Sequence, residues 1–231
     1  MLPNLKCRSL LLLSLLVGYH LPAQADALAT LSKKDAASGL KTALAQCADK
    51  AVQQLGAPDG FLKNAKVTIP LPPAFQKLDA ALRLFGRAGD ADALKTSLNH
   101  AAEDAVSQAG PVLKTSLRRM TLADAKGILA GGDDAATSYF RRSAGDELRT
   151  TFRPIVARAT AKVRLAGLYD QYAGKAAQYG LMNSTDANMN EYVTAKALDG
   201  LFVVMADEEL AIRKDPMGQA SSILKKVFGV L

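Results

Sequence analysis

The chain has few of the side chains from which most catalytic sites are built. Of its 231 residues, two are histidines, two are cysteines and none is tryptophan. A hydrolytic triad needs a base beside its nucleophile, and after loss of an N-terminal segment that contains His20, only His100 remains. No CxxC or HExxH pattern occurs, and no GK[ST] follows Gly131-Gly132, so the known thiol, zinc and phosphate-loop motifs are missing. The sequence predicts no catalytic residue, no metal site and no cofactor.

The first 25 residues have the pattern of a cleaved export signal. Lys6 and Arg8 form a basic start, Leu10–Val17 is an apolar run, and Ala23-Gln24-Ala25 gives a small-x-small cleavage site. We expect the mature chain, residues 26–231, to begin near Asp26 and to work in the periplasm. The apolar run is too short to cross a bilayer, so we expect no transmembrane span in the mature chain.

Removal of this segment changes the cysteine count and the charge. Cys7 is lost, so Cys47 has no partner within the chain, and we expect no internal disulfide. The formal charge of +7 falls to +5, or 27 basic against 22 acidic residues, once Lys6 and Arg8 are gone. A mildly basic exported protein suits contact with an anionic envelope component, and export argues against a nucleic-acid partner.

The hydrophobic pattern is helical almost throughout and predicts an all-α fold. Apolar residues recur every three or four positions from Leu40 to Leu55 and again from Tyr139 to Phe152. Residues 198–206 are apolar on nearly every side, which indicates a central, buried helix. We expect a single irregular domain over residues 26–231 with about eight or nine helices. One short proline-rich, extended excursion is expected within residues 57–73.

Two local patterns predict helix starts in the middle of the chain. Thr121 and Asp124 have the spacing of a capping box. Asp133 and Asp134 follow two glycines, and we expect one of them to cap the next helix, while the other could bind a cation or an arginine. His100 and Glu103 are one turn apart and could share a metal, but a structural role for His100 is the favoured interpretation.

Several phrases of the sequence occur together in a recognisable order. They are Asp59–Asn64, Ile69–Pro72, Gly131–Thr137, Tyr192–Phe202, Ile212–Pro216 and Leu224–Gly229. In this order they resemble an exported, helical bacterial family known as domain of unknown function 4197, from about residue 35 to the C-terminus. The resemblance implies a helical fold and an envelope location. It implies no activity, so it transfers no functional residue.

The favoured function is non-enzymatic binding of a lipid or another apolar or amphiphilic ligand between helices. Tyrosines with one polar end can line a cleft between helices, and the predicted site combines them with nearby charges. Its residues are Tyr139, Arg142, Tyr169, Tyr172, Tyr192, Lys196, Asp199 and Glu208. This cleft would lie against the helix that contains residues 198–206, and the basic stretch from Arg141 to Arg164 would meet an anionic head group.

Other interpretations stay open. The tyrosines could lie at the edge of the core, the basic stretch could be a solvated helix surface, and Lys196, Asp199, Glu208 and Arg213 could form a structural network. For the whole protein, the alternative is an envelope interaction or scaffold protein without a small-molecule site. A third possibility is a carboxylate-based enzyme.

Overall fold

The computed structural model describes residues 33–73, 75, 88–163, 166–167, 169–170, 178 and 187–214, and these form helices and connecting turns without a strand. The six helices are α2 (Lys33–Leu55), α4 (Ala88–Ser107), α5 (Gly110–Arg119), α6 (Leu122–Leu129), α7 (Ala135–Thr160) and α9 (Met189–Lys214). The predicted all-α class is confirmed. The described residues contain six helices, fewer than the eight or nine that the sequence predicted. The apolar patterns near residues 75–85 and after Pro216 also predict helices, but these segments lie mostly or wholly outside the described residues. The export signal and Tyr172 also lie outside.

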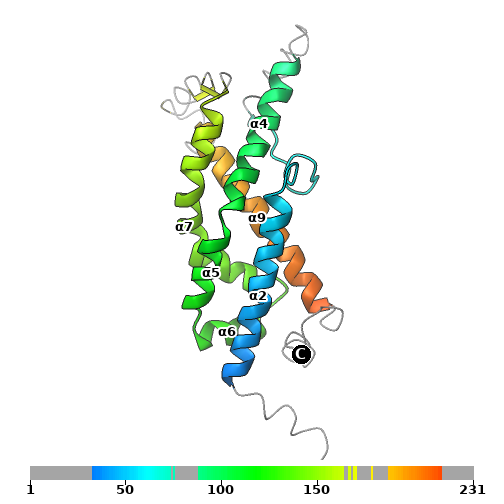
Figure 1. The fold of residues 1–231 in the computed structure, drawn as a ribbon, viewed down its shortest axis with the longest axis vertical. Helices are drawn as coiled ribbons and strands as arrows, with labels where there is room; N and C mark the ends of the chain where they lie inside the picture. The colour runs from blue at the N-terminus through cyan, green and yellow to red at the C-terminus, as the bar shows by residue number, and fades with distance from the viewer. Residues whose placement is uncertain are drawn as a thin grey trace, which may run out of the picture.

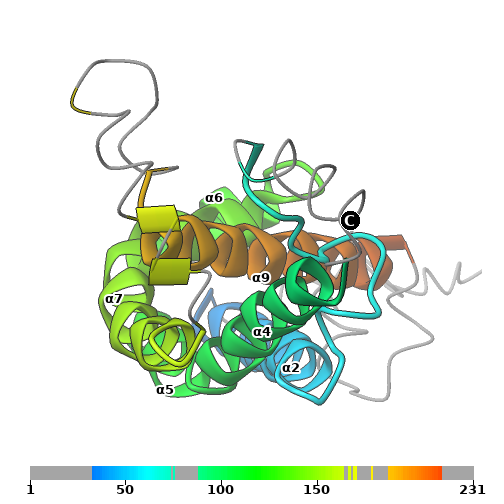
Figure 2. The same cartoon turned by 90° about the horizontal axis from the view of Figure 1, so that it is seen from above.

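The long helices pack side by side, and α9 crosses them (Figure 1). Helices α2, α4, α5 and α7 run close to the long axis of the molecule, whereas α9 runs obliquely behind them, as the view from above shows (Figure 2). Helix α9 packs against α7, α4 and α2, and α4 also packs against α7. The crossing places α9 at the centre of the fold, so its burial is as expected for a helix that is apolar on most sides.

The predicted apolar stripes are the surfaces that pack. In α2 the buried positions include Leu40, Leu44 and Leu55, and in α7 they include Leu148 and Phe152. Each repeats at three- or four-residue spacing, which places the side chains on one helix face. Complete burial of one such side chain contributes about 1.5–3 kcal/mol, so these stripes supply most of the packing energy of the two helices.

The excursion that follows α2 is held against α9 by one close contact. Residues 56–72 contain turns and an extended piece but neither helix nor strand, as the prolines predicted. The ring of Phe61 is fully buried and lies so near the α9 backbone that a Cβ at Gly200 would come within 2.6 Å of its Cε1 atom. Glycine at position 200 therefore creates the space in which this turn docks on α9.

The two predicted helix starts have different outcomes. The capping box of α6 is present, because the main-chain N–H of Asp124 donates to Thr121 Oγ1 and that of Thr121 donates to Asp124 Oδ2. The Thr121 hydroxyl also donates to Asp124 Oδ2 at 2.7 Å, and this bond, followed by the one from the Thr121 main-chain N–H, lowers the pKa of the Asp124 carboxyl. Asp134 is the residue before α7, but its side chain does not cap the helix. The cap of α7 comes from elsewhere in the chain, as described below.

Across the residues that the structure describes, none of the helices combines the length and the apolar character that crossing a membrane requires.

Candidate functional site

A buried carboxylate on α9 caps the start of α7. Glu209 is 3% exposed and accepts hydrogen bonds from the main-chain N–H groups of Ala136 (2.9 Å) and Thr137 (2.8 Å), and from the Thr137 hydroxyl. The guanidinium of Arg213 donates to Glu209 at 2.8 Å and to the main-chain carbonyl of Ile128, in the last turn of α6. Glu209 thus accepts from N–H groups at the start of α7 that the helix itself leaves unpaired, and Arg213 adds a further donor to a carbonyl at the end of α6.

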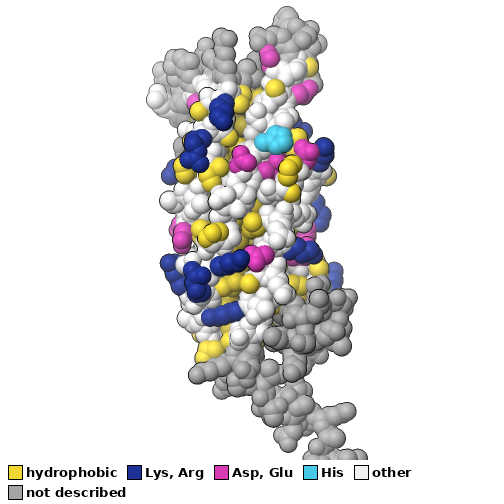
Figure 3. Space-filling view, viewed as in Figure 1, with side chains coloured by type: hydrophobic (Ala, Val, Ile, Leu, Met, Phe, Trp, Pro, Cys, Tyr) yellow, Lys and Arg dark blue, Asp and Glu magenta, His cyan; other side chains and the backbone are white. Residues whose placement is uncertain are grey.

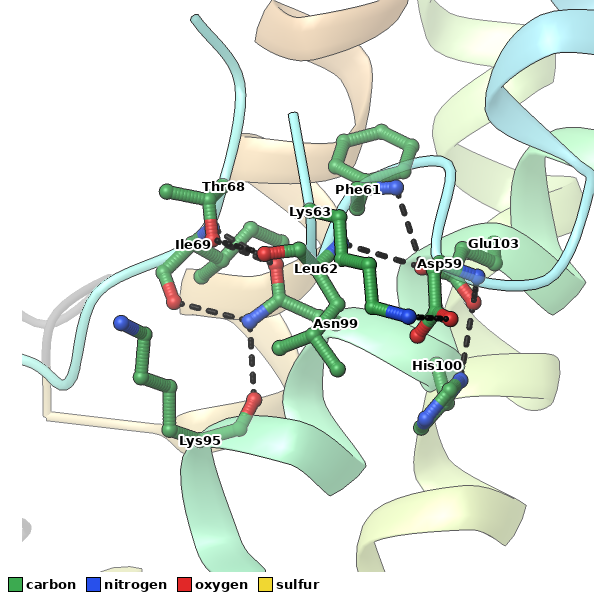
Figure 4. A network of polar contacts seen from close by, with 10 residues as sticks. All are labelled: Asp59, Phe61, Leu62, Lys63, Thr68, Ile69, Lys95, Asn99, His100 and Glu103. Carbon is green, nitrogen blue, oxygen red and sulfur yellow. Dashed lines mark hydrogen bonds and ion pairs between the residues drawn. The ribbon is translucent and has the colours of Figure 1, made fainter. Parts of the chain in front are cut away.

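A second buried carboxylate holds the excursion after α2 (Figure 4). Glu103 on α4 accepts main-chain N–H groups from Asp59 (3.2 Å), Phe61 (3.0 Å) and Leu62 (3.1 Å). Its other neighbour is His100, whose Nδ1 atom lies 2.8 Å from Glu103 Oε2. Asp59 has a positive φ of 64°, a strained conformation for a non-glycine residue, and the bond to Glu103 helps to hold it there.

Asn99, one helical turn from Glu103, binds the same excursion further along. Its amide accepts from the main-chain N–H of Ile69 (2.7 Å) and donates to the main-chain carbonyl of Ile69 (3.0 Å). The sequence interpretation of His100 as structural agrees with this neighbourhood. No group of three or more histidine, cysteine, aspartate or glutamate side chains that could hold a metal ion occurs in the described part of the chain.

The four residues considered as one network have separate partners. Asp199 lies 3.7 Å from Arg141, and Glu208 lies 2.5 Å from the ammonium of Lys50 on α2. Lys196 lies over the ring of Tyr192, and Arg213 pairs with Glu209. The buried carboxylate that the predicted network left out is Glu209. The sequence did indicate that Glu209 is buried, because it lies between Met205 and Ile212 on the buried stripe of α9.

The described tyrosines of the predicted site belong to the core. Tyr139 donates from its hydroxyl to the main-chain carbonyl of Ser116 (2.9 Å), and Tyr192 donates to that of Pro70 (3.1 Å). Tyr169 packs its ring on Phe75 with 5.8 Å between centroids. All three tyrosines are buried. The structure brings Tyr192 and Lys196 together but places Tyr139 and Tyr169 in separate contacts, and Arg142 is exposed on α7.

Cys47 is buried and has no disulfide partner among the described residues. Its thiol lies 3.6 Å from the main-chain carbonyl of Met205. Burial, followed by the negative charges of Glu208 and Glu209, raises the pKa of the Cys47 thiol to about 12. The thiolate form is therefore suppressed, and with it the nucleophilic and metal-binding chemistry that requires a thiolate.

An open groove of about 980 Å³ lies between the end of α4, the start of α5 and the last turns of α7. We call it the α4–α7 groove. Its apolar lining includes Pro111, Val112 and Ile155, and its basic residues are Arg158 and Lys162. Neither of these cations has an ion-pair partner among the residues of the described helices and turns. Arg158 lies in the last turn of α7 and Lys162 in the turn that follows this helix.

Figure 3 shows the molecule from the side on which α4, α5 and α7 lie in front. Basic side chains (dark blue) follow the edge formed by α7 and α5, and apolar side chains (yellow) lie between α7 and α4. The volume of the groove is at the upper end of the range of about 300–1,000 Å³ for small-molecule sites. The combination of an apolar lining with unpaired cations suits a molecule that has both an apolar and an anionic part.

A smaller hollow of about 580 Å³ lies between α2 and α5, with Lys41, Lys114 and Arg118 in its lining. Two of these cations are already engaged. Lys114 lies 3.0 Å from Asp49, and Arg118 donates to the Thr115 hydroxyl. The α4–α7 groove is therefore the stronger candidate for a ligand site.

The sequence was also compared with known proteins. The model of the family described as "Protein of unknown function (DUF4197)" matches residues 30–229. No curated protein and no solved structure shows significant similarity to the chain.

Proposed function

Since the chain belongs to the DUF4197 family of proteins of unknown function, which suggests no activity, we propose a function from the geometry: non-enzymatic binding of an amphiphilic ligand in the α4–α7 groove. One observation carries the proposal. Arg158 and Lys162, without ion-pair partners in the described structure, line the same groove as Val112 and Ile155. A ligand with an anionic head and an apolar part would neutralise the cations and cover the apolar side chains.

Burial of the apolar part of the ligand and contact of its anionic head with the two cations both contribute to the free energy of binding. Each methylene group moved from water into an apolar environment contributes about 0.8 kcal/mol. A head group such as a phosphate can accept hydrogen bonds from both cations, and charge-assisted hydrogen bonds are about twice as strong as neutral ones. The groove is open, so its ligand can exchange with the surroundings.

We place the site in this groove rather than between α7 and α9. The hydroxyls of Tyr139 and Tyr192 already bind main-chain carbonyls, and their rings are buried in the core. The sequence hypothesis had two parts, a tyrosine-lined cleft and a basic helix that meets an anionic group. The α4–α7 groove retains the second part, because Arg158 of α7 lines it.

We propose that this binding takes place in the periplasm, after removal of the first 25 residues. The support is the basic start, apolar run and cleavage site in the sequence. An envelope scaffold remains the alternative, and it would call for a large exposed apolar patch. In the described residues, the exposed large apolar side chains are Leu122 and Val203, single residues on different helices.

A carboxylate-based enzyme is the least supported candidate. Among the described residues the buried carboxylates are Glu103 and Glu209, and each already accepts two or more main-chain hydrogen bonds. A general acid or base must exchange a proton with a substrate within hydrogen-bonding reach, whereas these carboxylates are occupied by the fold.

The first experiment is native mass spectrometry of the protein purified from its own periplasm, followed by solvent extraction. We expect a co-purifying amphiphile at a defined stoichiometry.

The second experiment measures calorimetric binding of dihexanoyl phosphatidylglycerol below its micelle concentration. The double variant Arg158→Gln/Lys162→Gln should bind at least about tenfold more weakly, because two charged contacts are lost. The double variant Lys95→Gln/Lys126→Gln removes two exposed charges away from the groove and should bind as the unmodified protein does. Equal affinity of both variants, or no binding by the unmodified protein together with a ligand-free native mass, would overturn the proposal.

A further inference from the structure

The α4–α7 groove has an acidic residue as well as two basic ones. Asp104 belongs to the α4 side of the groove, whereas Arg158 lies at the end of α7 and Lys162 in the turn that follows it. The ion pairs of the described residues do not include Asp104. Figure 3 shows acidic side chains (magenta) over α4 and basic ones on the α7 side of the same face. Charges of both signs therefore line one groove, and in the ligand-free molecule they do not neutralise each other as ion pairs.

The polar neighbours of Asp104 leave its carboxylate available. The Ser107 hydroxyl donates to the main-chain carbonyl of Asp104 at 2.7 Å, and the amide of Gln108 donates to the Ser107 hydroxyl at 3.0 Å. These bonds organise the end of α4 without using the carboxylate. An ionised carboxylate only accepts hydrogen bonds, so its natural partner in a ligand is a positively charged donor.

We infer that the ligand is a zwitterionic amphiphile, with its anionic group bound by Arg158 and Lys162 and a primary ammonium group bound by Asp104. The inference rests on the proposed function and specifies the head group. A purely anionic head group would gain from the two cations but would be repelled by Asp104. A phosphoethanolamine head group combines a phosphodiester with an ammonium two carbons away, so it places both signs of charge within one small unit.

The ammonium must also be able to donate hydrogen bonds. A primary ammonium has three N–H donors, and a charged donor to a carboxylate makes one of the stronger classes of hydrogen bond. A quaternary ammonium has the same charge but no donor. The groove should therefore distinguish phosphatidylethanolamine from phosphatidylcholine as well as from phosphatidylglycerol.

The test measures calorimetric affinity for three dihexanoyl phospholipids below their micelle concentrations: phosphatidylethanolamine, phosphatidylglycerol and phosphatidylcholine. We expect phosphatidylethanolamine to bind about fivefold or more tightly than the other two, as a contact between exposed opposite charges implies. Asp104→Asn should reduce its affinity to that of phosphatidylglycerol and leave phosphatidylglycerol binding unchanged or slightly tighter. Asp146→Asn, at an exposed position of α7 away from the groove, should leave all three affinities unchanged.

The outcomes separate this inference from the proposed function. The zwitterionic head group would be ruled out if phosphatidylglycerol bound as tightly as phosphatidylethanolamine, or if Asp104→Asn had no effect. The groove would then still be a site for an amphiphile. No binding of any of the three lipids would overturn both.

Glycerophosphoethanolamine, the head group without its acyl chains, is the last probe. It should bind at least about tenfold more weakly than the lipid, because it leaves the apolar lining uncovered. Equal affinity would keep the assignment of the two charges but would overturn the amphiphilic part of the proposed function.

Discussion

Glu103 and Glu209 are two buried carboxylates with the same task and different surroundings. Each projects from one helix and accepts main-chain N–H groups of a distant segment. The cationic partner of Glu209 is Arg213, whose side chain is 12% exposed, whereas the neighbour of Glu103 is His100, whose side chain is 46% exposed. The Glu209 centre is closed, and the Glu103 centre borders solvent.

The comparison shows how this fold treats charge. Inside the molecule each carboxylate has enough hydrogen bonds to offset its loss of hydration. In the α4–α7 groove, the charged side chains of Arg158, Lys162 and Asp104 have no ion-pair partner among the described residues. Binding activity is therefore expected on the groove, and stability is expected to depend on the two centres.

The largest effect should come from Glu209→Ala. The substitution removes the acceptor for two main-chain N–H groups and leaves the guanidinium of Arg213 largely buried without its carboxylate. Breaking a buried pair from one side costs about 3–5 kcal/mol, which urea unfolding would measure.

The matched control is Glu208→Ala at the next position. Glu208 pairs with Lys50, whose side chain is 64% exposed, so we expect a loss of less than about 1 kcal/mol. Similar losses in the two variants would contradict the distinction between the buried pair and the exposed pair.

Glu103→Ala should have an intermediate effect. Three main-chain N–H groups lose an acceptor, but water can reach this centre more easily, so we expect a loss of about 1–3 kcal/mol. Hydrogen exchange should accelerate first at the amides of Asp59, Phe61 and Leu62 while the centre of α7 stays protected.

The control for this centre is His100→Ala, which keeps the carboxylate and should cost less than about 1 kcal/mol. A loss in Glu103→Ala as large as that in Glu209→Ala would show that solvent access does not separate the two centres.

The smallest effect concerns Cys47, the buried cysteine whose thiol lies 3.6 Å from the main-chain carbonyl of Met205 on α9. The pKa of its thiol is raised to about 12 in the folded protein, so the folded state retains a proton that the unfolded chain releases near its ordinary value of 9.0. The free energy of unfolding is therefore independent of this ionisation below about pH 9 and falls as the pH rises from 9 toward 12, because only the unfolded chain ionises in that range.

A thiol reagent at pH 8 should therefore modify Cys47 at the rate of unfolding, and urea should accelerate the reaction. Burial is the first cause of the shift and the charge of Glu208 the next, so Glu208→Gln, which leaves the buried pair of Glu209 and Arg213 intact, should accelerate labelling only modestly. Rapid labelling of the unmodified protein at pH 8 would contradict this account.

Local patterns predicted most of the described fold. The stripes of α2 and α7 and the capping box of Thr121 and Asp124 involve residues at most four positions apart, and single-sequence periodicity detects such neighbours. The cap of α7 was predicted locally, at Asp133 or Asp134, but the structure supplies it from Glu209, 73 residues away from Ala136. No local pattern specifies which distant carboxylate reaches a helix end.

The same limit applies to the candidate site. The basic character of α7 was evident from the sequence, but the apolar lining comes partly from Pro111 and Val112 on α5, and only the packing of α5 beside α7 brings them to Arg158. The tyrosines have polar ends in the sequence, and their actual partners are main-chain carbonyls of Ser116 and Pro70, which sequence patterns do not reveal.

The pairing of Asn99 with Ile69 bears on solubility. Residues 67–69 are rich in β-branched side chains, and an extended segment of this kind with unpaired main-chain groups is a template for edge-to-edge aggregation. Asn99 occupies both main-chain polar groups of Ile69, and Tyr192 occupies the carbonyl of Pro70. Side chains from α4 and α9 thus use the main-chain groups that a neighbouring strand would otherwise bind. Another molecule therefore cannot pair with this segment at Ile69.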